Sequence, residues 1–226
     1  MENNTISFIL SSNLKRWREK ILFAFGSGKS YPSGYVFSNS GEVGPFTYYL
    51  LDGVVKVYTR NPNGYNRLVG YHQKDTIFAL DCCRGSEIAT VSTEAVTSCQ
   101  VIKITAEELK EFCQKEPEFC YEFMLFEQDV LRLMCYNAEI QTSATVTSRL
   151  ASFLLLFMQS EEYRRLGHIN LSQDNIASIV NASRIQVARV QEKMQDEGMI
   201  KIGRKKLWVL NRARLKYFSE NAHLNI

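Results

Sequence analysis

The chain has 226 residues, of which 45% are hydrophobic and 23% are charged, and its formal net charge is +3. These ordinary globular values exclude fibrous and largely disordered proteins, and the length fits one large or two modest domains. The six cysteines form no CxxC pair and the three histidines are widely separated, which excludes a disulfide scaffold and the usual zinc sites.

Targeting and membrane signals are also missing. The first residues lack the basic-then-apolar pattern of a secretory signal. The longest apolar stretch, residues 150–158, is far shorter than the roughly 20 residues that a membrane-spanning helix needs. We therefore expect a cytoplasmic protein with reduced thiols and without a membrane segment, a metal ion or a cofactor.

The first half of the chain changes texture after a short helical stretch. Residues 6–25 have a helical composition, with basic residues around Trp17. From about residue 31 to 105 the chain is rich in Gly, Tyr, Val and Thr, and turn residues separate short strand-like runs. We expect strands at residues 47–51, 54–59, 67–71, 88–92 and 99–104. Closely spaced short strands of this kind predict a β-sandwich or β-roll.

The pattern becomes helical near residue 105. Thr105 and Glu108 form a Thr-x-x-Glu capping box, and Pro117 suits the first turn of a longer helix. That helix carries a heptad seam of Phe119, Phe123, Phe126, Val130, Leu133, Asn137 and Ile140, beside a second apolar stripe of Cys120, Met124, Leu131, Met134 and Ala138. A helix that is apolar on two faces needs two packing partners, one to bury each face. We favour its own β-domain and a second copy of the chain as the two covers, over a core helix of one large domain.

A helix-turn-helix is predicted in the C-terminal part. Residues 141–145 are small and polar, which indicates a hinge, and a helix is expected at residues 146–163. Ser172 is placed to cap a short helix, Asn181 occupies the sharp turn, and Ser183 is placed to cap a second helix.

The second helix of this motif separates into two faces on a 100° wheel. Val187, Val190 and Met194 lie on the core side. The other side presents arginines, which suit guanine edges or phosphates, and an isoleucine, which suits a thymine methyl group. We expect DNA contacts from Ser183, Arg184, Ile185, Gln186, Ala188, Arg189 and Lys193.

A basic hairpin follows this helix. Gly198 ends the helix, and residues 199–210 predict a β-hairpin, or wing, whose tip residues Arg204, Lys205 and Lys206 are placed to contact phosphates. Residues 143–226 carry 13 Lys and Arg against 7 Asp and Glu, a net charge of +6, whereas the first 142 residues carry a net charge of −3. The basic excess coincides with the helix-turn-helix and favours double-stranded DNA as the partner over a merely solvated helix face.

The arrangement resembles the Crp/Fnr family of bacterial transcription regulators. The matching motifs are Tyr31-Pro32-Ser33 followed by Gly41-Glu42, residues 48–57 around Gly53, Asp75-Thr76-Ile77, and Ser183-Arg184-x-x-Val187-x-Arg189. The resemblance implies an α+β chain with a cyclic-nucleotide-binding-like β-roll (a double-stranded β-helix), a dimerisation helix and a winged helix-turn-helix. It also implies a homodimer that binds a two-fold symmetric promoter site, contacts RNA polymerase and most commonly activates transcription.

This resemblance divides the chain into three parts. We expect a sensor domain at residues 1–116, the dimerisation helix at 117–142 and the DNA-binding domain at 143–226.

The sensor residues depart from the family pattern. Cyclic-nucleotide-binding members carry Gly-Glu and Arg-Ser where an ungapped match places Phe78-Ala79 and Ala89-Thr90. Loss of the arginine removes charge-assisted phosphate contacts, so we expect no cyclic AMP binding. No cysteine precedes Cys82, which argues against an iron–sulfur cluster of the Fnr type. Ile185 stands where the family often has glutamate, which is expected to alter the operator preference.

The sequence leaves open what replaces the nucleotide. An apolar, sulfur-rich effector pocket is expected from Phe78, Cys82, Cys83, Met124, Met134 and Cys135. It would take a small apolar effector, or Cys82 and Cys83 would sense thiol redox state. The equally weighted alternative is a packed core without an effector.

Catalysis is not expected. Gly26-Ser27-Gly28-Lys29-Ser30 resembles the end of a P-loop, but Phe23 stands where the first glycine is needed and a turn follows in place of a helix. No other catalytic set is present. A dimeric effector-binding protein that does not touch DNA is the remaining alternative, and the basic outer helix face argues against it.

Overall fold

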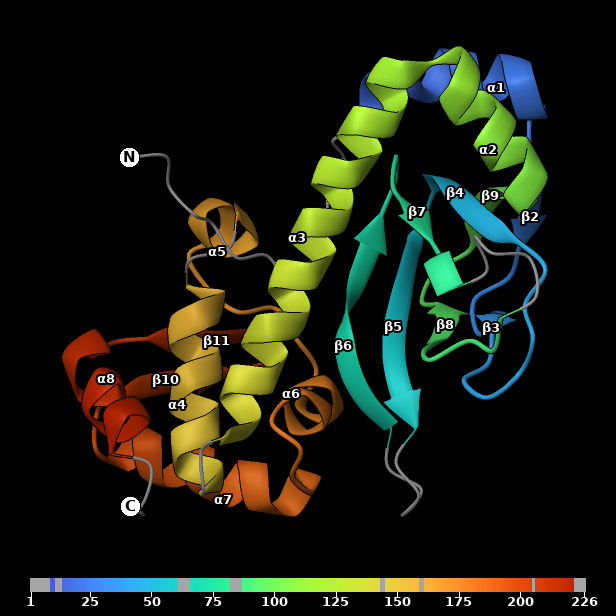
Figure 1. The fold of residues 1–226 in the computed structure, drawn as a ribbon. Coiled ribbons are helices and arrows are strands. Elements are labelled where there is room, and N and C mark those ends of the chain that lie inside the picture. The colour runs from blue at the N-terminus through green and yellow to red at the C-terminus, as the bar shows by residue number, and fades with distance from the viewer. Residues whose placement is uncertain are drawn as a thin grey trace. The chain divides into compact units, whose positions relative to one another are not determined.

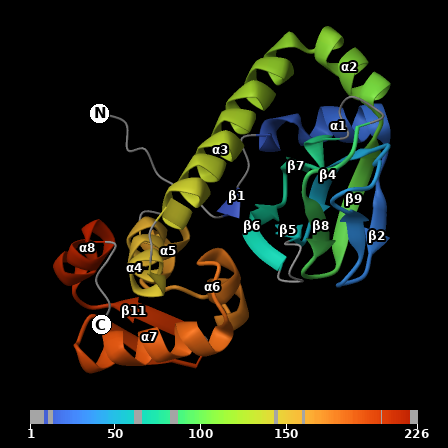
Figure 2. The same cartoon turned by 60° about the horizontal axis from the view of Figure 1, so that its bottom comes forward.

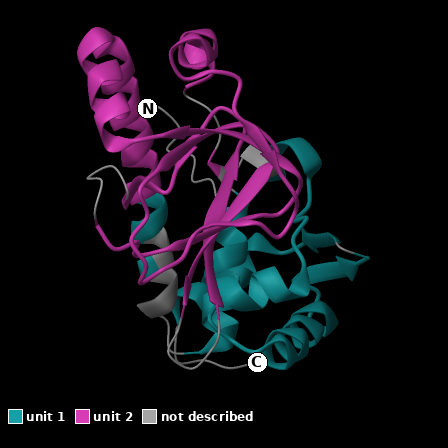
Figure 3. Cartoon of the chain, turned by 90° about the vertical axis from the view of Figure 1, so that its right-hand side faces the viewer, with its two compact units in different colours: residues 1–8, 132–226 teal, residues 9–131 magenta. Residues whose placement is uncertain are grey.

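The computed structural model describes residues 9–10, 14–60, 66–81, 87–142, 145–158, 161–204 and 206–221. The chain divides into two compact units, one of residues 9–131 and one that contains residues 132–226 (Figure 3). In the part of the chain that is described, no helix has the length and apolarity needed to cross a membrane.

The first unit is a β-roll of two sheets (Figure 1). The five-stranded sheet has the order β1 (Ile9–Leu10), β6 (Asn66–Gln73), β5 (Val54–Arg60), β8 (Ser92–Ala95) and β3 (Val36–Ser38). The four-stranded sheet has the order β2 (Lys29–Tyr31), β9 (Cys99–Ile104), β4 (Thr47–Asp52) and β7 (Ile77–Phe78). Neighbouring strands are antiparallel except for β1, which runs parallel to β6.

Strand alternation places the four-stranded sheet between two cores. Successive side chains of a strand point to opposite faces. Tyr48 and Leu50 of β4 therefore join the core inside the roll, whereas Tyr49 and Leu51 join a second core on the other face. Both faces of the strand are shielded from solvent, since Tyr49 and Leu50 are fully buried.

Helices cover the second core, which contains Tyr49 and Leu51 and which we call the outer core. A 3-10 turn (Lys15–Trp17) leads into α1 (Arg18–Phe25), and α2 (Ala106–Lys115) and α3 (Pro117–Thr142) follow the last strand. Figure 2 shows α1 and α2 at the same end of the roll. The ring of Phe119 in α3 meets Trp17 and Phe112 with centroids 5.5 and 4.8 Å apart. The carboxylate of Glu122 accepts a hydrogen bond of 2.7 Å from Trp17 Nε1, which ties the N-terminal segment to α3.

A buried carboxylate links three parts of this unit. Asp75, in the turn between β6 and β7, is 2% exposed and has a φ of 66°. Its Oδ1 accepts from Arg18 Nη1 at 2.8 Å and from the Tyr49 hydroxyl at 2.9 Å. Burial, with further contributions from Asp75, raises the pKa of Tyr49, so this hydroxyl stays protonated as the donor.

The second unit is a small helical domain with a two-stranded hairpin. Its elements are α4 (Val146–Phe157), α5 (Glu161–Leu166), α6 (Gln173–Ile179), α7 (Arg184–Asp196), β10 (Ile200–Gly203), β11 (Lys206–Val209) and α8 (Arg212–Glu220). Leu150, Phe153 and Phe157 of α4 are fully buried. The hydroxyls of Ser152 in α4 and Ser219 in α8 lie 2.8 Å apart, so α8 completes the core beside α4.

Most of the predicted elements are confirmed. The strands at 47–51, 54–59, 67–71 and 99–104 correspond to β4, β5, β6 and β9. The turn at Gly53 is confirmed as well: its φ is 100°, and a Cβ there would lie 2.6 Å from the carbonyl oxygen of Ser98, so only glycine fits.

Three predicted boundaries are wrong. Residues 9–10 form a strand on β6, so the expected helix at 6–25 begins only at residue 15. The strand expected at 88–92 lies at 92–95, because Ser92 pairs with Tyr58, whereas Ile88 makes only an isolated bridge. The helix expected at 146–163 ends at Phe157, and α5 begins at Glu161.

Candidate nucleic-acid interface

Side-chain caps define both helices of the helix-turn-helix. The hydroxyl of Ser172 accepts from the backbone N–H of Asn175 at 3.1 Å, which opens α6. Ser183 caps α7 by accepting from Gln186 N at 3.2 Å, while Gln186 Oε1 accepts from Ser183 N at 2.9 Å. The predicted caps are confirmed, and Gln186 completes a reciprocal capping box that the sequence analysis did not identify.

The turn between these helices is held by an arginine from α4. Asn181 has a φ of 50°, the left-handed conformation that asparagine tolerates well. Arg149 Nε donates to the carbonyl oxygen of Val180 at 2.7 Å, and its Nη2 donates to that of Asn181 at 3.3 Å. The guanidinium thereby satisfies carbonyls at the C-terminus of α6 and interacts favourably with the helix dipole. Sequence reasoning missed Arg149 because it lies 32 residues from Asn181.

The two faces of α7 differ sharply in burial. Val187 and Met194 are fully buried and Val190 is partly buried, so the expected core side is confirmed. Gln191 is also buried, which the helical wheel did not indicate. Of the predicted DNA contacts, Ser183 is partly exposed and the others on this helix are exposed: Arg184, Ile185, Gln186, Ala188, Arg189 and Lys193. They form one continuous outer face of the helix, which we call the α7 face.

Two acidic side chains border the α7 face, Asp174 in α6 and the exposed Glu192 of α7 itself. Arg184 Nη1 lies 3.9 Å from Asp174 Oδ1 in α6, and about 70% of each side chain is exposed, 68% and 73% respectively. An exposed pair at this distance contributes little free energy. Arg184 therefore remains able to exchange this contact for a phosphate or a base.

The wing is a regular hairpin with basic residues at its tip. Strands β10 and β11 pair from Ile200 with Val209 to Gly203 with Lys206. A Cβ on Gly203 would lie 2.8 Å from the ring of Trp208, so the glycine allows the ring to cover the hairpin. The two tip residues Arg204 and Lys206 are exposed, whereas Lys205 lies outside the described residues.

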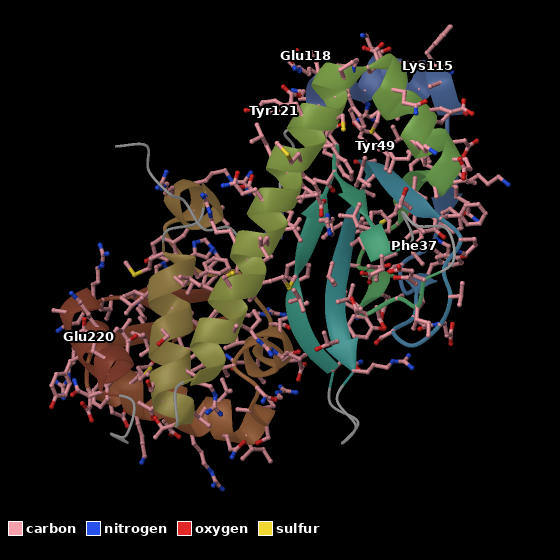
Figure 4. The ribbon with its side chains drawn as sticks, viewed as in Figure 1. Phe37, Tyr49, Lys115, Glu118, Tyr121 and Glu220 are labelled. Atoms are coloured by element: carbon pink, nitrogen blue, oxygen red, sulfur yellow. The ribbon has the colours of Figure 1, made fainter. Side chains whose placement is uncertain are left out.

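The residues expected to form an effector pocket fall in different surroundings. Phe78 is fully buried in the roll, with its ring centroid 5.1 Å from Phe37 (labelled in Figure 4) and 5.2 Å from Tyr48. Met124 is 56% exposed. Met134 is partly buried and Cys135 is exposed, while Cys82 and Cys83 lie outside the described residues.

A carboxylate occupies part of the cassette that binds the nucleotide phosphate in the resembled family. Asp81 Oδ2 accepts from the backbone N–H and the hydroxyl of Thr90 at 2.8 and 2.9 Å. Ala79 has a φ of 58° and Ala89 is 3% exposed.

Two buried polar groups lie where α3 crosses the roll. His72 of β6 is 4% exposed, its ring lies 6.1 Å from that of Phe126, and its Nδ1 makes no hydrogen bond. Burial lowers the pKa of His72 to about 3, so the ring is neutral. The Oε1 atom of Glu127 in α3 is also buried without a hydrogen bond, and burial raises the pKa of this carboxyl to about 7.

Replacing Glu127 with glutamine should remove a pH-dependent loss of stability. Because the folded-state pKa is raised, the wild type loses stability as pH rises from about 5 to 8, by about 1–3 kcal/mol at 1.36 kcal/mol per pKa unit. Glu127→Gln should match the wild type at pH 5 and exceed it at pH 8 in urea unfolding. The exposed Glu118→Gln on the same helix is the control. Parallel curves for Glu127→Gln and wild type at both pH values would contradict this prediction.

Comparison with known proteins agrees with this geometry. Residues 28–116 match the family described as a cyclic nucleotide-binding domain, and residues 148–218 match the Crp-like helix-turn-helix domain. The cAMP-activated global transcriptional regulator CRP of Salmonella typhimurium is 25% identical over 178 residues, covering 75% of this chain and 83% of that protein. The chain belongs to the Crp/Fnr family.

A second sequence relative and two solved structures are also similar to this chain. The CRP-like cAMP-activated global transcriptional regulator of Mycobacterium tuberculosis is 23% identical over 82% of this chain and 84% of its own. A CooA mutant from Carboxydothermus hydrogenoformans superposes with a TM-score of 0.75 at 15% identity, over 92% of this chain and 96% of that one. The regulator CLP of Xanthomonas campestris gives 0.71 at 20% identity, over 84% and 96%. The C-terminal unit is accordingly the helix-turn-helix domain of a CRP-like transcription regulator.

Proposed function

We propose that this Crp/Fnr family protein binds two-fold symmetric promoter sites as a homodimer and activates transcription by contacting RNA polymerase. The α7 face carries this proposal. It combines the exposed cations Arg184, Arg189 and Lys193 with the apolar side chain of Ile185. Ile185 is 66% exposed, which is unusual for a large apolar residue. Guanidinium groups beside an isoleucine and a small alanine suit the edges of bases in a major groove.

A dimer is supported by the outer surface of α3. The seam residues Phe119 and Phe126 are buried in the first unit, so the β-roll covers one face of the helix. The other face leaves large apolar side chains exposed: Tyr121 (57%), Met124 (56%), Leu125 (36%) and Leu131 (63%). Met124 and Leu131 are one heptad apart, the spacing by which two copies of a helix bury each other. Side chains of α3, among them Tyr121, are drawn in Figure 4.

We further propose the domain limits 1–116, 117–142 and 143–226, with α3 as the dimerisation helix. The exposed stripe on α3 and the basic charge of residues 143–226 support this division.

Cyclic AMP is not the proposed effector, although the curated relatives are cAMP-activated. Isothermal titration of the whole protein with cyclic AMP should give no binding heat, because Ala89 supplies no charge for the phosphate and Asp81 repels it. A micromolar dissociation constant would contradict this expectation. Cyclic GMP, which carries the same cyclic phosphate, should also give no binding heat in the same titration.

Binding to a labelled fragment of the protein's own upstream promoter tests the proposed function. Fluorescence anisotropy should show affinity that falls steeply with salt concentration, because lysines and arginines displace counterions from phosphates. A scrambled fragment of equal length and composition is the control for specificity. Equal affinity for both fragments, or no binding at low salt, would refute sequence-specific regulation.

A further inference from the structure

Two cysteines meet where α2 ends and α3 begins. Cys113 lies in the last turn of α2 and Cys120 in the first turn of α3, and their thiols are close enough to interact electrostatically. The residue before each cysteine is a phenylalanine, and the rings of Phe112 and Phe119 meet edge to face with centroids 4.8 Å apart. Since both rings are buried in the outer core, the packing of the two helices keeps the thiols together.

The two thiols differ in access to solvent. Cys113 is partly buried and packs against the outer core, whereas Cys120 is exposed. Burial, followed by the proximity of Cys120, raises the pKa of the Cys113 thiol to about 11. With this raised pKa, Cys113 stays protonated near neutral pH and reacts slowly, because the thiolate is the nucleophile. Cys120 is exposed and is therefore the thiol that dissolved reagents reach first.

We propose that Cys113 and Cys120 form a reversible intramolecular disulfide, which makes the α2–α3 corner a site of oxidation by low-molecular-weight disulfides. The Cys120 thiolate attacks a disulfide RSSR, whose S–S bond breaks, and RS⁻ leaves and takes up the proton that Cys120 released. The sulfur of Cys113 then attacks Cys120 Sγ in the mixed disulfide, and the second RSH leaves with the proton of Cys113. The protein loses two electrons and two protons, and RSSR is reduced to two RSH.

This site is independent of the DNA-binding proposal and of the cysteine pair at positions 82 and 83. Among the described cysteines, Cys99 is 2% exposed inside the roll, and Cys135 is exposed further along α3 than Cys120. Cys135 is thus a matched control, since it shares the helix and the exposure of Cys120.

Peptide mapping of the whole protein tests the proposal. The protein is equilibrated in oxidised glutathione, free thiols are blocked with N-ethylmaleimide, and the product is digested with trypsin without reduction. Cleavage after Lys110, Lys115 and Arg132 places the two cysteines on separate peptides, residues 111–115 and 116–132. We expect these peptides to be joined, with a mass two hydrogens below their sum, and to separate after dithiothreitol treatment.

Three variants distinguish this linkage from unspecific oxidation. Cys113→Ser should accumulate a glutathione adduct on Cys120, because the resolving sulfur is gone. Cys120→Ser should leave Cys113 open to N-ethylmaleimide, and Cys135→Ser should give the same joined peptides as the wild type. The proposal is overturned if the wild type yields peptides 111–115 and 116–132 separately, whether alkylated or glutathionylated. A bond between two copies of peptide 116–132 would also overturn it.

Discussion

Replacing Arg189 with alanine should weaken binding to the specific operator by about 1–3 kcal/mol, roughly 5- to 150-fold. Arg189 is exposed near the centre of the α7 face. Val187 and Met194 are buried on the opposite side of the same helix. A bidentate contact to a guanine edge is lost with the guanidinium, whereas the helix keeps its caps and its core. Anisotropy titrations against the operator and against a scrambled fragment measure the effect.

Arg184→Ala should act in the same direction with a smaller net loss. Its guanidinium already has an acidic neighbour in Asp174, 3.9 Å away, so binding DNA exchanges one charged contact for another. The Asp174→Ala variant should in turn bind all DNA more tightly, because it removes a negative charge beside the α7 face.

The wing should respond differently from the α7 face. Lys206→Ala is expected to weaken binding to operator and scrambled DNA by the same factor and to lower the salt slope by about 1, as loss of a phosphate contact does. Lys110→Ala, an exposed lysine of α2 in the other unit, is the control. If Arg189→Ala also weakened both DNAs equally, base recognition by this residue would be ruled out and only phosphate binding would remain.

Local signals explain why so much of the helix-turn-helix could be predicted from the sequence. Ser172 and Ser183 cap helices through bonds to residues only three positions away, and Gly198, with a φ of 70°, follows the end of α7. Such signals lie within one or two turns of chain and therefore need no knowledge of the rest of the fold.

Features that depend on distant partners could not be predicted in this way. Strand β1 has only two residues, and it is a strand because it pairs with Tyr71 and His72 of β6. Arg149 donates a hydrogen bond to the carbonyl oxygen of Val180 in the turn between α6 and α7, and these two residues are more than 30 positions apart. Phe78 was expected to line an effector pocket, but its surroundings depend on the aromatic rings that β3 and β4 bring to it. Nothing adjacent in the sequence specifies those contacts.

Asp75→Ala should destabilise the first unit by about 2–4 kcal/mol. The substitution leaves the fully buried hydroxyl of Tyr49 without its acceptor and deprives Arg18 of its ion pair, which is 2.8 Å long in the wild type. Alanine also tolerates the φ of 66° less well than aspartate does. Asp75→Asn keeps an oxygen for Tyr49 and the tolerance of the left-handed conformation, so its loss should be smaller.

Tryptophan fluorescence can follow this effect in the first unit alone. Trp17 packs on Phe119 in that unit and Trp208 lies in the wing, so a Trp208→Phe background leaves Trp17 as the single tryptophan reporter during urea unfolding. A double-mutant cycle of Arg18→Met with Asp75→Asn isolates the ion pair from the Tyr49 hydrogen bond. If Asp75→Ala and Asp75→Asn lowered stability equally, the ionic contact would carry the whole effect. If neither lowered it, the buried carboxylate would not hold α1 to the roll.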